Sequence, residues 1–181
     1  MSSFFELINK CHSCRDFNGE AVPYEEILKC VEAARLAPSA GNTQPWHFII
    51  VSKQEHLGKV AKCFQDGGKN TFTDNAGAFV IITEDGRCPI SKLSDSLATQ
   101  KFRAIDIGIS ASYFVLAATE LNISTCILGS LNERKLRTLL SIPKDIRIRL
   151  AVAMGYESED APSNVRERKS LEEILDKETY K

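Results

Sequence analysis

Apolar residues recur at the three-to-four-residue spacing of an amphipathic helix in several stretches of this 181-residue chain. The longest stretch spans residues 97–121, and the side predicted to be apolar comprises Phe102, Ile105, Ile109, Ser112, Leu116 and Ala117. A second helix is expected between Pro23, whose fixed φ suits a first turn, and Pro38, which marks its end. The remaining predicted helices are short: residues 4–8 before Cys11, residues 53–65, Asn132 to the residue before Pro143, and a last one opened by the capping-box pair Ser170 and Glu173.

Four shorter runs are apolar and rich in β-branched or aromatic residues, which predicts β-strands at residues 46–51, 78–83, 125–128 and 146–154. The first run, WHFIIV, is predicted to be a buried strand. In chain order the elements are helix, helix, strand, helix, strand, long helix, strand, helix, strand and tail. This order predicts an α+β fold in which helices cover a central sheet. Because no internal repeat or interdomain linker is visible, residues 1–181 are expected to form a single domain.

Composition narrows the classes of function. The chain is 43% hydrophobic and carries 23 Lys and Arg against 24 Asp and Glu, for a formal net charge of -1. This apolar share suffices for a core, and the charge balance argues against a general nucleic-acid binder. The start lacks a signal-peptide pattern, and no apolar run approaches the roughly 18 residues of a membrane span, so a cytoplasmic protein without a membrane partner is expected. The six cysteines are then most simply free thiols.

A polar loop at residues 37–46, APSAGNTQPW, joins the end of a predicted helix to a predicted strand. The side chains of Ser39, Asn42 and Gln44 can both donate and accept hydrogen bonds, as the edge of a planar heteroaromatic ligand requires. The same residue types also build turns in proteins that bind nothing there. Taken alone, the loop leaves both interpretations open.

A second candidate site is the segment CHSCR at residues 11–15. The donors of His12, Ser13 and Arg15 could bind a phosphate, although a polar connection between two helices would have the same sequence. Cys11 and Cys14 also form a C-x-x-C pair, which is typical of a thiol-redox protein or of half a zinc site. Because the other cysteines are isolated in the sequence, the second half of a zinc site is missing and no metal is expected.

Two further clusters lie later in the chain. Arg166 and Arg168 belong to the run RERK just before the predicted last helix, where charged residues normally form a solvated face. Residues 128–130, LGS, end a predicted strand, where backbone N–H groups either meet a ligand or simply turn the chain. The patterns G-x-G-x-x-G, G-x-x-x-x-G-K-[ST], G-x-S-x-G and H-E-x-x-H are all absent from the sequence, so none of their chemistries is indicated.

Taken together, these clusters resemble the motifs of the FMN-dependent nitroreductase family, in the same order and over nearly the whole chain. The family pattern R-[RH]-S-x-[RK]-x-F reads CHSCRDF at residues 11–17, and A-P-S-x-x-N-x-Q-P-W is matched at residues 37–46. D-I-G-I stands at residues 106–109, and ISTCILGS at residues 123–130 resembles G-x-x-T-C-x-I-G-G. A G-Y pair at residues 155–156, the basic tail and L-E-E-I at residues 171–174 complete the resemblance.

The resemblance implies a nitroreductase-like α+β fold with a central, mainly antiparallel sheet and a long central helix at the interface of a homodimer. It implies bound FMN at that interface and a ping-pong reaction in which NADH or NADPH reduces the flavin and nitroaromatics or quinones reoxidise it. No side chain is assigned as a catalytic acid or base. By analogy, the phosphate of FMN is held by His12, Ser13, Arg15, Arg166 and Arg168. The flavin ring lies beside Ile127, Leu128 and Gly129, and the residues that reach the partner's flavin are Pro38, Ser39, Ala40, Asn42 and Gln44.

Two features depart from the family pattern. Cys11 stands where the family has Arg, which removes a positive charge from the expected phosphate site and predicts weaker FMN binding. Residues 84–99 match no motif, so the elements that cover the substrate are not predicted. A non-enzymatic protein that stores or senses FMN therefore stays open as the alternative, as does a flavin dehalogenase on the same fold.

Overall fold

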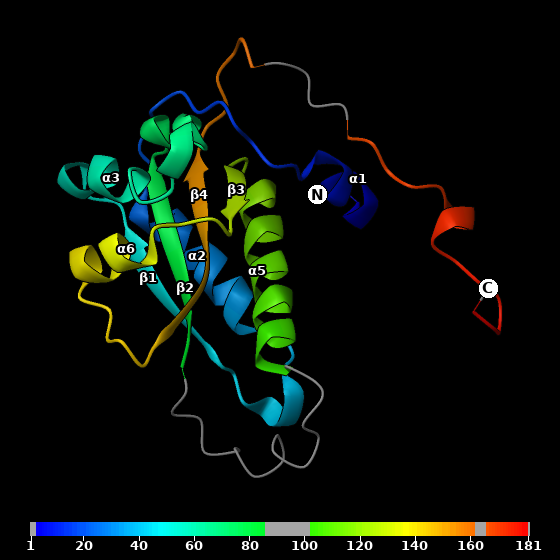
Figure 1. Ribbon diagram of the computed structural model, residues 1–181. Helices are drawn as coiled ribbons and strands as arrows, with labels where there is room; N and C mark the ends of the chain where they lie inside the picture. The colour runs from blue at the N-terminus through cyan, green and yellow to red at the C-terminus, as the bar shows by residue number, and fades with distance from the viewer. Residues whose placement is uncertain (1–2, 86–101, 162–165, 181) are drawn as a thin grey trace.

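A four-stranded sheet forms the centre of the molecule, which is a computed structural model describing residues 3–85, 102–161 and 166–180 (Figure 1). The strands are β1 (Trp46–Val51), β2 (Ala78–Glu84), β3 (Ser124–Leu128) and β4 (Arg147–Gly155). Their order is β1-β2-β4-β3, and all three neighbouring pairs are antiparallel. The predicted α+β fold around an antiparallel sheet is confirmed.

Helices cover both faces of this sheet (Figure 1). The described α-helices are α1 (Phe4–Lys10), α2 (Tyr24–Arg35), α3 (Gln54–Ala61), α5 (Phe102–Glu120) and α6 (Glu133–Leu140). Short 3-10 turns are η1 (Ala40–Asn42), η2 (Asp66–Gly68), η3 (Thr71–Asn75) and η4 (Leu171–Glu173). Helices α2 and α5 bury one face of the sheet, and α3 and α6 bury the other.

The two faces give two hydrophobic cores that meet at β2. Phe79 and Ile81 belong to the core beneath α3 and α6, whereas Val80 and Ile82 belong to the core beneath α2 and α5. This division follows from the two-residue period of a strand, which sends successive side chains to opposite faces. The sequence of β2 is therefore a nearly continuous apolar run, because both faces of the strand are buried.

Local capping signals place several helix ends where the sequence predicts them. Ser3 and Glu6 form a capping box at the start of α1. The Asn132 side chain accepts a hydrogen bond from the Lys135 N–H at 3.1 Å, which opens α6. Pro23 stands at the cap position of α2. Each signal acts over a few residues, so it can be identified without knowing the tertiary fold.

The buried side of α5 differs from the predicted one. The residues that α5 buries are Asp106, Ile107, Ser110, Ala111, Phe114, Ala118 and Thr119. Ile105 and Ser112, which were expected on the apolar side, are exposed, with Ile105 at 50%. The prediction was wrong because α5 is apolar on nearly every side, so hydropathy selects no face. Contact with α2 and with the sheet decides instead which side is buried.

Helix α5 is the one helix, among the described residues, with the length and apolar composition of a membrane span. The expectation that no stretch of the chain reaches that length is therefore corrected. The helix packs against α2 and also contacts β2, β3 and α1. A core helix of this kind meets the same criteria of length and composition.

Two other predictions needed correction. Strand β1 is an edge strand, so only Trp46 and Val51 are buried and its middle is partly exposed. Ser170 and Glu173 do form the predicted capping box, but it opens only the 3-10 turn η4. An isolated turn without packing partners gains too little to extend into a helix. The unplaced stretch 84–99 lies outside the described residues except for Glu84 and Asp85.

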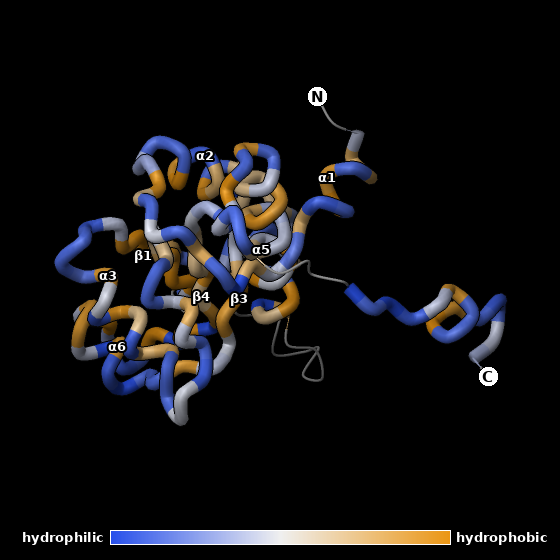
Figure 2. Tube along the Cα trace, turned by 90° about the horizontal axis from the view of Figure 1, so that it is seen from above, coloured by the Kyte–Doolittle hydropathy of each residue, from blue (hydrophilic) through white to orange (hydrophobic). Residues whose placement is uncertain are grey.

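The two ends of the chain project from the body (Figure 2). Helix α1 exposes Phe4 at 63% and Phe5 at 72%, and it buries none of its residues. The C-terminal segment extends still farther and exposes Leu171, Ile174 and Leu175. Apolar side chains therefore lie uncovered on both projecting segments.

Candidate active site

A pocket of about 380 Å³ lies where the segment after α1 meets β3, α5 and the basic tail. Its lining residues are Cys11, His12, Ser13, Arg15, Val115, Thr125, Ile127, Arg166 and Arg168. The structure thus brings together the basic segment at residues 11–15, the end of β3 and the RERK run. No carboxylate lines this pocket in the part of the chain that the structure describes.

The edge of β3 positions the segment at residues 11–15. Ser13 forms a parallel bridge to Thr125, and the Cys14 N–H donates to the Thr125 carbonyl at 2.9 Å. The Cys14 side chain is fully buried in the core between the exposed Ser13 and Arg15. Because side chains alternate along an extended segment, burial of Cys14 leaves Ser13 and Arg15 facing the pocket.

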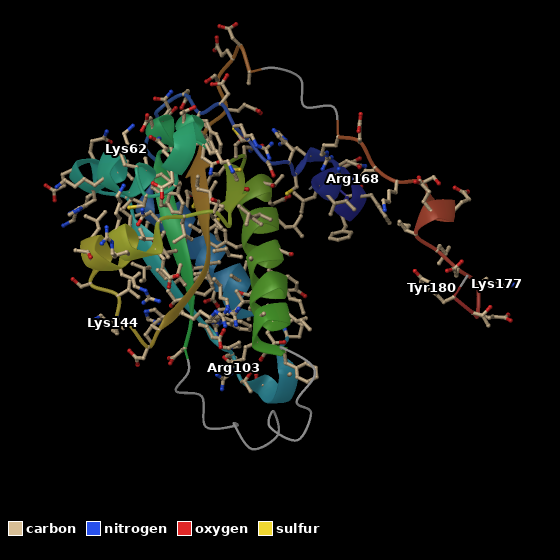
Figure 3. The ribbon with its side chains drawn as sticks, viewed as in Figure 1. Lys62, Arg103, Lys144, Arg168, Lys177 and Tyr180 are labelled. Atoms are coloured by element: carbon tan, nitrogen blue, oxygen red, sulfur yellow. The ribbon has the colours of Figure 1, made fainter. Side chains whose placement is uncertain are left out.

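The arginines of the tail reach the pocket from the other side. Arg166 donates to the carbonyls of Ile8, Asn9 and Cys11 at the end of α1, the first at 3.3 Å. A cation at the C-terminal end of a helix is favourable, so this contact fixes the tail beside α1. Arg168, which Figure 3 shows on the same side of the molecule as α1, donates to the Glu167 carbonyl at 2.8 Å. A guanidinium has five N–H donors, so Arg168 keeps others for a ligand.

His12 lines the pocket, but both of its ring nitrogens already have partners. Nδ1 lies 3.0 Å from the Lys10 carbonyl, and Nε2 lies 3.0 Å from a carboxylate oxygen of Glu157. Both partners accept hydrogen bonds, so this position favours the protonated ring, which donates from both nitrogens. The Lys10 carbonyl, followed by Glu157, raises the pKa of His12 against the opposing effect of burial. His12 therefore has no free ring nitrogen for a ligand, while Ser13 and the arginines have donors available.

The end of β3 contributes one of its three predicted residues to the lining. Ile127 is 46% exposed and faces the pocket. Leu128 is buried in the core beneath α3 and α6, so its side chain is not available to a ligand there. Gly129 follows the strand and is exposed. Only the main chain of Leu128 and Gly129 could therefore meet a molecule beside Ile127.

The polar loop at residues 37–46 lies near the opposite end of α5 (Figure 1). Its Ala40 N–H contacts Asp106 in the first turns of α5, whereas Val115 lines the pocket nine residues later. At 1.5 Å per residue, these positions are about 14 Å apart along the helix. The loop residues Pro38, Ser39, Ala40, Asn42 and Gln44 therefore do not line the pocket of their own chain.

This loop has an unusual backbone. Asn42 and Gln44 have φ values of 56° and 46°, in the left-handed region that side chains other than glycine rarely adopt. The Ser39 hydroxyl accepts from the Gln44 N–H at 3.0 Å, and the Gln44 amide donates to Asn42 Oδ1 at 3.1 Å. Strained backbone of this kind is enriched at functional sites. The loop therefore forms a turn, as the structural interpretation of its sequence predicts. Its strained backbone also favours the second interpretation, a binding role.

The five cysteines of the described residues form no disulfide. Burial raises the pKa of the Cys14 thiol to about 11, which disfavours the reactive thiolate. Cys11 and Cys14 are both free thiols. Within the described ranges, no three His, Cys, Asp or Glu side chains gather as a metal site would require. Cys88 lies outside those ranges.

Sequence reasoning missed three residues at or beside the pocket, and it also missed Asp106 beside the polar loop. Val115 and Thr125 line the pocket, but apolar and hydroxyl residues in a helix and a strand give no signal of their own. Glu157 pairs with His12 from a position 145 residues away in the sequence. Asp106 had a signal that could have been used, because it is an acidic residue within a long apolar helix.

Comparison with known proteins identifies the family. The sequence matches the model of the family described as "Nitroreductase family" over residues 8–68 and 59–156. A relative from Archaeoglobus fulgidus, named "Putative NADH dehydrogenase/NAD(P)H nitroreductase", is 32% identical over 164 residues, which cover 88% of each chain. An iodotyrosine deiodinase from Thermotoga neapolitana is 22% identical over 172 residues, covering 90% of this chain and 92% of the relative.

Solved structures show the same fold. A nitroreductase family protein from Clostridium difficile 630 has a TM-score of 0.81 and 27% identity, over 99% of this chain and 100% of that one. An FMN-dependent nitroreductase from Clostridium difficile R20291 has a TM-score of 0.77 and 23% identity, over 98% of this chain and 100% of that one.

The fold and the sequence matches define a nitroreductase-type oxidoreductase, and the chain belongs to the nitroreductase family. It is an NAD(P)H-dependent oxidoreductase. The resemblance inferred from the motifs is confirmed.

Proposed function

We propose that this enzyme is an FMN-dependent homodimer that reduces electron-poor acceptors, such as nitroaromatics and quinones, with NADH or NADPH. One observation supports it above the others: Arg15, Arg166 and Arg168 converge with the Ser13 hydroxyl on one pocket. Family membership supports the reaction type. The FMN dependence of a structural neighbour supports the choice of cofactor.

The chemistry of the pocket fits FMN. A phosphate group of charge near -2 is best held by several cations and hydroxyl donors, which the three arginines and Ser13 offer. The cations come from segments at opposite ends of the chain, which explains how a protein of net charge -1 can present a cationic pocket. Ile127 and Val115 add apolar surface that suits a planar ring.

Two observations support a homodimer. The exposed face of α5 carries Ile105 and Tyr113, and α1 carries Phe4 and Phe5, so apolar surface lies uncovered along α5 and on α1. The polar loop lies about 14 Å along α5 from the pocket of its own chain. A two-fold pairing that packs α5 against its copy would bring that loop toward the partner's pocket. We therefore assign Pro38, Ser39, Ala40, Asn42 and Gln44 to the FMN of the partner.

The residues of this chain bind and orient the cofactor, and no side chain is proposed to move a proton. Ser13, Arg15 and Arg168 donate to the phosphate, and Arg166 adds charge while it holds the tail on α1. The main chain at Leu128 and Gly129 can place N–H groups where negative charge develops on reduction. The chemistry that FMN supplies when bound is hydride transfer from NAD(P)H and onward delivery to the acceptor.

Two measurements test the proposal. Titration of the apoprotein with FMN, followed by flavin fluorescence, should show saturable binding. Steady-state rates at varied NADH and quinone should give parallel double-reciprocal lines, because the oxidised nicotinamide leaves before the acceptor binds. Intersecting lines would count against the ping-pong scheme, and absence of FMN uptake would contradict the assignment of the cofactor.

The relatives named iodotyrosine deiodinase support a second candidate, reductive dehalogenation of an iodinated phenol. The two candidates share the cofactor and the pocket and differ in the acceptor. Assays with 3-iodotyrosine and with a quinone, using the same enzyme preparation, distinguish them. Iodide release that outpaces quinone reduction would favour the dehalogenase.

A further inference from the structure

Asp106 is a buried carboxylate in an otherwise apolar setting. The residue is 4% exposed in the first turns of α5, where Ile107 and Ala111 are also buried. Burial of an ionised carboxylate is unfavourable unless a donor compensates it. Burial accordingly raises the pKa of Asp106, and the Ala40 N–H opposes that shift.

That donor comes from the polar loop. The Ala40 N–H lies 3.3 Å and 3.2 Å from the two carboxylate oxygens of Asp106. The carbonyl on the other side of the same peptide group, that of Ser39, accepts from the Asn42 N–H at 2.9 Å. A carboxylate bound to one side of a peptide group polarises it and strengthens the bond on the other side. Asp106 thus acts on the turn that sets the backbone of the loop.

The loop needs such support because its own conformation is strained. Asn42 and Gln44 both occupy the left-handed region. The bond from the Gln44 N–H to the Ser39 hydroxyl and the bond from the Gln44 side-chain amide to Asn42 Oδ1 both stay within the loop. The Asp85 N–H holds the far end through the Pro45 carbonyl at 2.7 Å. The bond from Ala40 to Asp106 joins the near end of the loop to the rigid helix α5.

We propose that Asp106 is a positioning residue for cofactor binding: it holds residues 39–44 in the conformation that meets the partner subunit's FMN. This inference rests on the proposed function. It assigns to Asp106 a role that requires no contact with the cofactor. A neutral acceptor would fill the same space but bind the Ala40 N–H less strongly, because charge-assisted hydrogen bonds are the stronger ones.

Three full-length variants test the role. Asp106→Ala removes the acceptor, and Asp106→Asn keeps the shape and a neutral acceptor. Ser110→Ala is the matched control, because Ser110 is equally buried on the same side of α5 but donates to the Ala34 carbonyl of α2 at 2.9 Å. Hydrogen exchange of the Ala40 amide in the apoprotein reports on the loop, FMN titration reports on the site, and thermal unfolding reports on the fold.

We expect Asp106→Ala to accelerate exchange at Ala40 and to raise the Kd for FMN about tenfold. Asp106→Asn should change both in the same direction by a smaller factor without lowering Tm, so the role remains testable if the alanine variant fails to fold. Ser110→Ala should lower Tm and leave Ala40 exchange and the Kd unchanged.

The experiments distinguish an error in the role of Asp106 from an error in the proposed function. Unchanged Ala40 exchange in both Asp106 variants would overturn the positioning role, whatever FMN does. Faster exchange with an unchanged Kd would also overturn it, because the loop would then not serve the cofactor. Failure of the wild-type enzyme to bind FMN would overturn the proposed function itself.

Discussion

Ser13 and Arg15 reach the pocket because Cys14 between them is buried, and Arg166 and Arg168 reach it because the tail is bound to the end of α1. The residue types could be identified from the sequence as a phosphate-binding set. The sequence alone could not show that both ring nitrogens of His12 already have hydrogen-bond partners. Hydrogen-bonding capacity is readable from a sequence, but its use depends on which acceptors the fold brings near.

The arginines give the first prediction. Because charge-assisted hydrogen bonds to phosphate contribute about 1.5–3 kcal/mol each, Arg15→Ala and Arg168→Ala should each raise the Kd for FMN at least tenfold. Fluorescence titration of the apoprotein measures this. Arg134→Ala on the exposed surface of α6 is the matched control and should leave the Kd unchanged. An equal loss in the control would mean that general charge, and not the pocket, sets the affinity.

Cys11 gives a prediction of opposite sign. Cys11 lines the pocket at the position where the family pattern has Arg. Cys11→Arg should therefore tighten FMN binding, because it adds a cation beside the phosphate. Gln54→Arg adds the same charge at the exposed start of α3 and should not change the Kd. If Cys11→Arg leaves the affinity unchanged or weaker, the interpretation of Cys11 as a lost phosphate contact is wrong.

His12 predicts a pH dependence of stability. Its pKa is raised in the folded protein above the ordinary value of 6.5, first by the Lys10 carbonyl and also by Glu157. Because of this shift, the protonated His12 ring stabilises the folded protein. The contribution is complete below the ordinary pKa of 6.5 and is lost as pH rises through the pKa of the folded protein. Melting temperatures measured from about pH 5 to about pH 8 should fall less steeply in His12→Gln than in wild type.

The positions of the helices and strands were the part of the structure that the sequence predicted best. Helix starts at Pro23 and Asn132 follow from local caps, and the four strands follow from short apolar runs bounded by turn residues. The buried side of α5 and the exposure of β1 were not predictable in the same way. They depend on which neighbour each element meets, and hydropathy within one element carries no such information.

Close packing between elements predicts the effect of two glycine substitutions. A Cβ at Gly77, just before β2, would lie 2.1 Å from the Glu20 carbonyl oxygen, so Gly77→Ala should destabilise the fold by about 1–3 kcal/mol or more. Gly58→Ala in α3 meets nothing within 4 Å and should stabilise the fold by up to about 1 kcal/mol. Denaturant unfolding measures both. Equal effects at the two positions would contradict the close approach at Gly77.

At the scale of the whole molecule, the candidate site joins segments more than 150 positions apart in the sequence, such as Arg15 and Arg166. Physical reasoning on the residues alone left each cluster open to an ordinary structural explanation. The family resemblance supplied the expectation that they converge, and the pocket brings the 11–15 segment, Ile127 and the tail arginines together. The polar loop stays at the other end of α5, which supports our proposal that it completes the site of a second copy.

The central claim is that this nitroreductase-type enzyme carries electrons on an FMN held by the arginine pocket. The most direct measurement is the visible absorption of the FMN-saturated protein, recorded without oxygen after addition of NADH or NADPH and again after addition of a quinone. We predict that the flavin absorbance bleaches and then returns, and that Arg15→Ala with Arg168→Ala releases the colour on gel filtration. A protein that takes up no FMN, or whose colour neither nicotinamide bleaches, would contradict the claim.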